Sequence, residues 1–312
     1  MAPTSKFMQT AYLNFMRSRA NSFPRSALLV ASAVLCLLQQ PAAATEESVV
    51  AKLSNGLTVS AYFHKGLPNR PAVLILHGFL QTAQSPPMSA LAGNLASKGY
   101  TVLSPTISLG VNRRNQSMAC QGVHTHTVPD DVAEIAYWMK WLDTHGFKNI
   151  VSIGFSSTGN FEAMLYNAQG MQPAVKRTIL VSLNPISSAP PNQQKQAGHD
   201  KAAFSADEKK LAMYSLGYCN NNYTASNRAY ASYAQYNAAK TLALVNRSPV
   251  PLDIILGSID SILPPNWAAT LQSQGGHAHL TLVANANHFF DDTAEFDLAE
   301  AVESILKNIP GP

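Results

Sequence analysis

The stretch that decides the fold is Asn149-Ile150-Val151-Ser152-Ile153, which runs directly into Gly154-Phe155-Ser156-Ser157-Thr158-Gly159. The apolar first half predicts a buried strand, and the small residues that follow predict a sharp turn into a helix. A serine on such a turn is exposed above the sheet, and the next backbone N–H can face a reacting carbonyl oxygen. The stretch therefore predicts a strand, a turn and a helix with a serine at the edge of a sheet.

Strands and helices alternate on both sides of this turn. A hairpin is expected first, with strands at 49–53 and 57–62 around Asn55-Gly56. Further strands are expected at 72–76, 100–104, 149–153, 177–182, 252–256 and 279–283, and helices at 88–98, 130–146, 267–273 and 293–308. This alternation predicts an α/β fold with a mostly parallel sheet flanked by helices. We expect one such domain over residues 45–312.

The alternation stops between about residues 184 and 250, a stretch rich in Ala, Tyr, Asn and Gln. An insertion between two core strands on the carboxyl side is well placed to cover a site. We therefore expect a helical cap here, with peripheral decoration as the alternative. Within it, Tyr230, Tyr233 and Tyr236, together with Tyr223, have a spacing that suggests one packed helix face.

Two later strand ends carry the groups that a serine nucleophile needs. A serine hydroxyl is a poor nucleophile at neutral pH and requires an imidazole base that is oriented by a carboxylate. The strand at 252–256 is followed by Gly257-Ser258-Ile259-Asp260, and the last strand runs into Asn287-His288. Asp253 is a rival carboxylate, but it lies inside its strand rather than beyond the carboxyl end. Ligands of open α/β sheets bind at that edge.

With these elements the chain resembles the α/β-hydrolase family, whose nucleophile turn reads G-x-S-x-G and whose triad follows the chain order Ser, acid, His. Gly154 and Ser156 match the first two fixed positions, whereas Thr158 stands at the third and Gly159 comes one residue late. The resemblance implies Ser156 as nucleophile, Asp260 as acid and His288 as base. In a competing register Ser157 would be the nucleophile.

The resemblance extends to the turn after the first expected parallel strand, His77-Gly78-Phe79-Leu80. It is similar to the family's His-Gly turn, which supplies one N–H of the oxyanion hole. This likeness implies an oxyanion hole made from the backbone N–H groups of Phe79 and Ser157. His77 is interpreted as structural.

The segment Cys120-Gln121-Gly122-Val123-His124-Thr125-His126 contains three side chains that could bind a metal, but their spacing fits no zinc site and we predict no metal. We expect His124 and His126 at the rim of the substrate pocket, with ordinary hydrogen bonding to backbone as the alternative. Cys120 and Cys219 would form a disulfide if the protein is exported, or else remain two buried thiols.

The charge distribution bears on compartment and partners. The chain of 312 residues has a formal net charge of +4, but residues 1–44 hold four of its 22 basic residues and no acidic one. This leaves 18 basic and 18 acidic residues, which removes the main support for nucleic-acid binding. Residues 1–44 read as a secretory signal: a basic start, an apolar run of about 12 residues and the small residues Ala42-Ala43-Ala44. The run is shorter than the roughly 20 residues of a membrane-spanning helix, so no stable anchor is expected.

Taken together, these patterns predict an exported, periplasmic or secreted, serine hydrolase that cleaves small-molecule carboxylic esters without a cofactor, after signal cleavage near Ala44. An amide- or peptide-cleaving hydrolase is the alternative within enzymes, because the same triad serves both reactions. A non-catalytic binding protein of the same fold is the alternative outside enzymes. The acyl group and the oligomeric state are left open.

Overall fold

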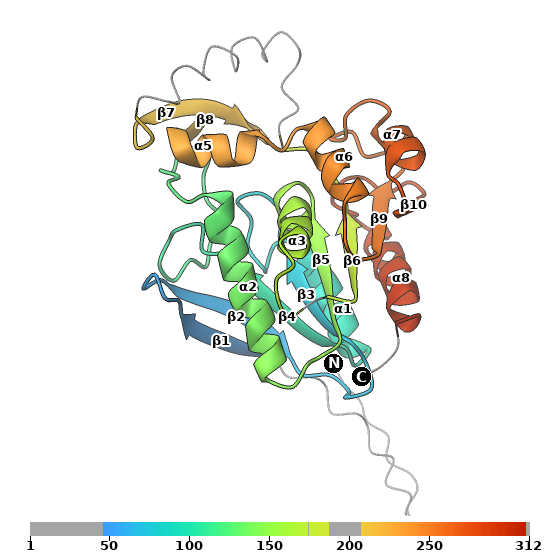
Figure 1. The fold of residues 1–312 in the computed structure, drawn as a ribbon. Helices are drawn as coiled ribbons and strands as arrows, with labels where there is room; N and C mark the ends of the chain where they lie inside the picture. The colour runs from blue at the N-terminus through green and yellow to red at the C-terminus, as the bar shows by residue number, and fades with distance from the viewer. Residues whose placement is uncertain (1–45, 174, 187–206, 310–312) are drawn as a thin grey trace, which may run out of the picture. The chain divides into compact units, whose positions relative to one another are not determined.

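The structure is a computed structural model that describes residues 46–173, 175–186 and 207–309. Its centre is an eight-stranded sheet in the order β1-β2-β4-β3-β5-β6-β9-β10 (Figure 1). The strands are β1 (Glu46–Lys52), β2 (Thr58–His64), β3 (Ala72–Leu76), β4 (Thr101–Thr106), β5 (Ile150–Phe155), β6 (Arg177–Val181), β9 (Leu252–Gly257) and β10 (His279–Val283). The β1–β2 and β2–β4 pairs are antiparallel and the other five neighbouring pairs are parallel, so the predicted mostly parallel sheet is confirmed.

Helices cover both faces of this sheet, as the alternation predicted (Figure 1). Helices α1 (Met88–Ser97) and α8 (Ala294–Lys307) pack on one face. The other face is covered by α2 (Val128–Thr144) and α3 (Thr158–Ala168), with α7 (Trp267–Gln274) nearer the edge. The central strands β3 and β5 are buried along their whole length, which is why β3 is a continuous apolar run and β5 is interrupted by only one polar residue, Ser152.

Local sequence signals explain where two of these helices begin and end. Helix α2 begins with a capping box, in which the Asp130 carboxylate accepts hydrogen bonds from the Thr127 backbone N–H at 2.9 Å and from its hydroxyl at 2.7 Å. Helix α1 ends before Gly99, whose φ of +81° lies in the left-handed region that favours glycine. Both expected helices are therefore present.

The described part of the insertion contains helices α5 (Asn227–Ala234) and α6 (Ala238–Asn246), as expected of a helical cap. It also contains an antiparallel hairpin that the sequence did not predict, formed by β7 (Leu211–Leu216) and β8 (Cys219–Ser226). Tyr223 belongs to β8, so the expected single face of four tyrosines is wrong. Tyr230 and Tyr233 do share α5, where both are buried.

The predicted secretory signal at residues 1–44 lies outside the described residues. Within the described residues, no helix combines the length and the apolar composition that a membrane crossing requires.

Candidate active site

The serine of the central turn stands at the carboxyl end of β5, one residue beyond the strand. Ser156 has a φ of +58°, and its backbone N–H donates to Val181 O at 2.9 Å, which ties the turn to the neighbouring strand β6. Asn160 in α3 adds a clamp, because its side-chain amide donates to the backbone oxygens of Ser156 and Val181. A left-handed backbone at a serine is unfavourable and persists only where the surroundings impose it.

The glycine that comes one residue late in the motif explains why Thr158 is tolerated. A Cβ added to Gly159 would stand 2.7 Å from the backbone oxygens of Leu76 and His77, and one added to Gly154 would collide with the Gly159 backbone. The close approach of turn and strand therefore depends on Gly154 and Gly159. Thr158 instead faces a small internal cavity.

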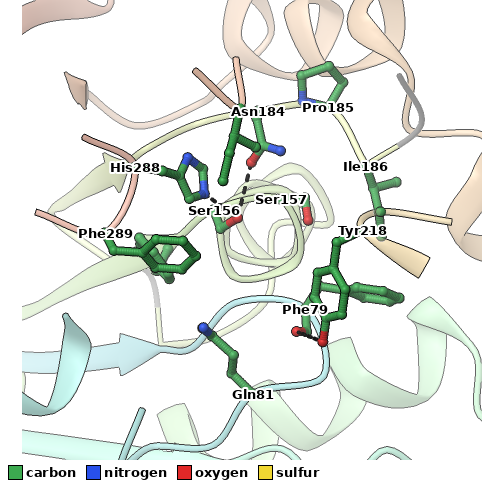
Figure 2. A pocket seen from close by; sticks show the side chains of 13 residues that line it. Phe79, Gln81, Ser156, Ser157, Asn184, Pro185, Ile186, Tyr218, His288 and Phe289 are labelled. Atoms are coloured by element: carbon green, nitrogen blue, oxygen red, sulfur yellow. Dashed lines mark hydrogen bonds between the residues drawn. The ribbon is translucent and has the colours of Figure 1, made fainter. Parts of the chain in front are cut away.

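The structure brings the three side chains expected to form a triad into one hydrogen-bonded series. Ser156 Oγ lies 2.9 Å from His288 Nε2 (Figure 2). On the other side of the ring, His288 Nδ1 lies 2.7 Å from Asp260 Oδ2. The imidazole side chain is 4% exposed and the carboxylate side chain is fully buried, so bulk water does not compete for their hydrogen bond. With Nδ1–H donated to the carboxylate, Nε2 is the nitrogen that can accept a proton from the serine.

The two rival residues lie elsewhere. Ser157 occupies the N-cap position of α3, and the His288 ring nitrogen that faces this turn bonds to Ser156 rather than to Ser157. Asp253 lies near the amino end of β9, where Arg177 Nη1 donates to its carboxylate at 3.0 Å. The hydrogen bonds of the His288 ring therefore go to Ser156 and Asp260 and not to the two rival residues.

Phe79 and Ser157, the residues of the expected oxyanion hole, both line the pocket that contains Ser156. Among the described residues, no acceptor is paired with the backbone N–H of either one. Two backbone donors beside a serine hydroxyl can stabilise the negative charge of a tetrahedral intermediate.

Buried Arg114 holds the oxyanion turn, residues 77–80, in place. No sequence motif points to this role. Arg114 donates to Gln81 O at 2.7 Å and to Ile107 O at 2.7 Å, and its Nη2 lies 3.1 Å from His77 Nε2. Burial, and next the charge of Arg114, lower the pKa of His77 to about 3, so this histidine is neutral. His77 Nδ1 contacts Gly78 O at 2.9 Å, which agrees with its interpretation as structural.

The pocket in front of Ser156 has a volume of about 170 Å³ and is enclosed mainly by aromatic and aliphatic side chains. The lining consists of Phe79, Gln81, Phe155, Ser156, Ser157, Asn184, Pro185, Ile186, Gly217, Tyr218, Ile262, His288 and Phe289 (Figure 2). No Asp, Glu, Lys or Arg side chain is among these residues. Gly217 and Tyr218 come from the turn between β7 and β8, so the insertion covers the site rather than decorating the periphery.

The expected place of His124 and His126 at the pocket rim is wrong. His124 is fully buried and stacks on Tyr223 with ring centroids 4.3 Å apart, and His126 is buried next to Tyr233. Burial is the main cause that lowers the pKa of both, in the case of His126 to about 3. They are packed beneath the insertion because the segment from Cys120 pairs with β8 through backbone hydrogen bonds.

Cys120 and Cys219 are joined by a disulfide, with their Cα atoms 5.7 Å apart. The bridge ties the segment before His124 to the first residue of β8, directly beside Tyr218 in the pocket wall. Within the described residues, no group of His, Cys, Asp and Glu side chains is arranged to hold a metal ion.

Comparisons with known proteins agree on the architecture. No protein-family model and no curated protein sequence matches the chain. Solved structures do: Est1E from Butyrivibrio proteoclasticus is 15% identical, with a TM-score of 0.60 over 83% of this chain and 97% of that one. The α/β hydrolase GrgF from Penicillium sp. sh18 is 15% identical (TM-score 0.61; 84% and 97% covered), and an esterase from Pyrococcus furiosus is 16% identical (TM-score 0.57; 86% and 92% covered).

The chain thus has the α/β-hydrolase fold, and the likeness covers nearly the whole of each of these structures. The fold implied by the sequence resemblance is confirmed. At such low identities the likeness shows the fold, while the chemistry has to be argued from this chain's own residues.

Proposed function

We propose that this protein is a serine hydrolase that cleaves carboxylic esters through a Ser156-Asp260-His288 triad and a covalent acyl-enzyme. The observation that carries the proposal is the series of two hydrogen bonds, 2.9 Å from Ser156 Oγ to His288 Nε2 and 2.7 Å from His288 Nδ1 to Asp260 Oδ2, at the base of an apolar pocket. A nucleophile, a base and an orienting carboxylate in this relation are the parts that acyl transfer requires.

In the acylation step Ser156 Oγ attacks the ester carbonyl carbon while its proton passes to His288 Nε2. The carbonyl oxygen becomes an oxyanion that accepts hydrogen bonds from the backbone N–H groups of Phe79 and Ser157. Asp260 stabilises the imidazolium and holds its orientation. When the intermediate collapses, the bond to the alkoxy oxygen breaks and His288 gives that oxygen its proton, which releases the alcohol.

Deacylation repeats these steps with water. His288 Nε2 takes a proton from a water molecule whose oxygen attacks the acyl carbon. The second intermediate expels Ser156 Oγ, which recovers its proton from the imidazolium, and the carboxylic acid leaves.

The pocket favours a small, uncharged substrate. A cavity of about 150 Å³ lined by apolar side chains holds a benzene ring, so 170 Å³ accommodates one aromatic ring or a short aliphatic chain. An anionic or cationic acyl group would lose its hydration without gaining a charged partner from the lining residues. Ferulic acid, a single-ring acid, is bound to Est1E in one solved structure, which makes its methyl ester a sensible member of a substrate panel.

A fluorophosphonate probe tests the enzyme proposal directly. We expect it to label the purified wild-type protein and the Ser157→Ala variant but not Ser156→Ala, since only Ser156 Oγ is bonded to His288. Labelling that survives Ser156→Ala and disappears in Ser157→Ala would assign the nucleophile to the other serine. A wild-type protein that is neither labelled nor active on any ester would leave the non-catalytic binding protein as the better proposal.

The reaction class within enzymes is tested with matched substrates. Esters and anilides of the same acyl groups, graded from acetyl to a single aromatic ring, would be compared by kcat/KM. We expect the esters to be preferred, because an alkoxide is a better leaving group than an amide nitrogen. A preference for the anilides would favour the amide-cleaving alternative.

We further propose that the protein is exported after cleavage near Ala44. The basic and apolar character of residues 1–44 supports this, as does the Cys120–Cys219 disulfide, since such bridges persist in oxidising compartments. N-terminal sequencing of the protein recovered outside the cytoplasm tests it. A product that retains Met1 would contradict the proposal.

A further inference from the structure

A second side chain, besides His288, reaches the hydroxyl of Ser156. Asn184 Oδ1 lies 3.2 Å from Ser156 Oγ, and His288 Nε2 lies 2.9 Å from the same oxygen (Figure 2). Asn184 is half-buried and lines the pocket, three residues beyond the end of β6. It belongs to neither the triad nor the oxyanion turn, and no sequence motif points to it.

The two residues before Asn184 are hydrogen-bonded to the loop that carries His288 and to α7, the helix that follows the Asp260 turn. Ser182 Oγ donates to the backbone oxygen of His288 at 2.7 Å. The indole N–H of Trp267, at the start of α7, donates to Leu183 O at 2.7 Å. These two hydrogen bonds tie the segment that presents Asn184 to the histidine loop and to α7, and they hold the amide near the imidazole.

The number of hydrogen-bond donors and acceptors at Ser156 Oγ determines which way the Asn184 amide must be oriented. A serine hydroxyl has one proton, yet His288 Nε2 and Asn184 Oδ1 both lie within reach as acceptors. If the proton goes to Asn184, His288 cannot withdraw it and the nucleophile is idle. If it goes to His288, the amide can keep its contact only by turning 180° about its terminal bond, so that its NH₂ group donates to Oγ.

We infer that Asn184 is a further catalytic residue of the hydrolase, one whose side-chain amide donates a hydrogen bond to Ser156 Oγ and holds that oxygen in its attacking position while the hydroxyl proton points to His288. The inference rests on the proposed function. The same donor faces Oγ again when this oxygen leaves the acyl carbon in deacylation and carries developing negative charge. Its role is distinct from that of the oxyanion hole, which receives the substrate's carbonyl oxygen.

Two substitutions separate this role from simple packing. Asn184→Ala removes the donor, and we expect kcat/KM to fall about tenfold, the size of one hydrogen bond to the reacting atom, with an unchanged pH profile. Asn184→Asp preserves the shape but places a carboxylate next to the imidazolium that forms on His288. We expect this variant to move the acid limb of the profile of kcat/KM upward by about one pH unit.

The exposed Asn308, at the end of α8, provides the control for a new negative charge. We expect Asn308→Asp to leave both kcat/KM and the acid limb unchanged. A thermal melt would show whether Asn184→Ala folds poorly. If it does, Asn184→Asp still tests the inference, because this substitution is nearly isosteric.

The two proposals can fail separately. If the wild type hydrolyses esters and is labelled at Ser156, while Asn184→Ala stays within twofold of wild type and Asn184→Asp leaves the acid limb in place, the role of Asn184 is overturned and the hydrolase stands. If the wild type is neither labelled nor active, both proposals fail.

Discussion

The two walls of the pocket are built in different ways. The wall that carries Ser156, Asp260 and His288 consists of turns that directly follow strands β5, β9 and β10, and a network of backbone hydrogen bonds holds it in place. The opposite wall includes Gly217 and Tyr218 from a two-stranded hairpin outside the central sheet. The Cys120–Cys219 disulfide and backbone hydrogen bonds join this hairpin to the loop that contains Cys120 and His124. This contrast suggests that the sheet edge supplies the chemistry and the insertion selects the substrate.

The largest expected effect concerns the wall that carries Ser156, Asp260 and His288. Asp260→Asn should lower kcat by about 10⁴-fold without lowering stability by a comparable amount, because an amide in this position no longer favours the productive imidazole tautomer or the imidazolium. Steady-state kinetics with a short-chain ester measures it.

Asp253→Asn is the matched control, since it changes the carboxylate inside β9, the strand that leads to Asp260. It breaks a pair with Arg177 at the far end of β9 and should reduce thermal stability while leaving kcat near that of the wild type. Equal losses of kcat in both variants would show that Asp260 acts through the fold rather than through His288.

The next effect tests the wall built by the insertion. Replacing both cysteines, Cys120→Ser and Cys219→Ser, opens a bridge between residues 99 positions apart. The expected loss is about 2–4 kcal/mol in the free energy of unfolding, measured by urea denaturation. Because Cys219 is adjacent to Tyr218, we also expect a higher KM and unchanged fluorophosphonate labelling of Ser156.

A reducing agent provides the control for this variant. It should raise KM of the wild type and leave the double serine variant unaffected. If the variant keeps the wild-type stability and KM, the hairpin is held by its other contacts, and the contrast between the two walls disappears.

Much of the first wall could be predicted from the sequence, because its signals are local. Apolar runs mark the strands, and Ser156, Asp260 and His288 each follow one of them within a few residues. Thr158 departs from the G-x-S-x-G pattern, but the neighbouring Gly159 provides the small residue that the turn requires. The chain order Ser, acid, His that is typical of the α/β-hydrolase family then relates these three turns to one another, although they are far apart in the sequence.

The residues that sequence reasoning missed or misplaced are held by partners from distant segments. Arg114 and Asn184 carry no local motif, and their partners His77 and Ser156 are 37 and 28 residues away. His124 and His126 resembled exposed loop residues, yet the insertion buries them. Such contacts depend on how the chain folds back on itself, which periodicity does not encode.

A smaller effect concerns Tyr218, the exposed side chain of the hairpin turn. Its ring contacts the ring of Phe79 edge to face, with centroids 5.5 Å apart, above the oxyanion turn. Tyr218→Ala should lower kcat/KM for an aromatic ester about threefold to tenfold, the size of one lost aromatic contact. We expect most of that loss in KM.

Met213 in the same hairpin is a suitable control, because it is as exposed as Tyr218, 70% against 66%, and does not line the pocket. Met213→Ala should leave kcat/KM unchanged. A similar loss in both variants would indicate that the hairpin as a whole, not the Tyr218 ring, sets the affinity.

The smallest effect concerns a buried acidic cluster that links the insertion to the core. Asp131 of α2 and Glu162 of α3 are both buried, and the Tyr233 hydroxyl of α5 donates to Asp131. Burial, and for Glu162 also the charge of Asp131, raise the pKa of both carboxyl groups well above the usual range. Burial lowers the pKa of the nearby Arg114 to about 10, so this arginine keeps its charge until strongly alkaline pH.

A carboxyl group whose pKa is raised by folding contributes its full stability below its unfolded pKa and loses it as the pH rises through the folded pKa. The free energy of unfolding should therefore decrease on the alkaline side, by at most about 1.4 kcal/mol per pH unit for each proton released. Glu162→Gln removes one of the two groups and should flatten this decrease, as measured by urea denaturation from pH 6 to pH 9. Glu295→Gln, an exposed change on α8, should leave the wild-type slope. If Glu162→Gln also leaves it, the buried acidic cluster does not govern the pH dependence of stability.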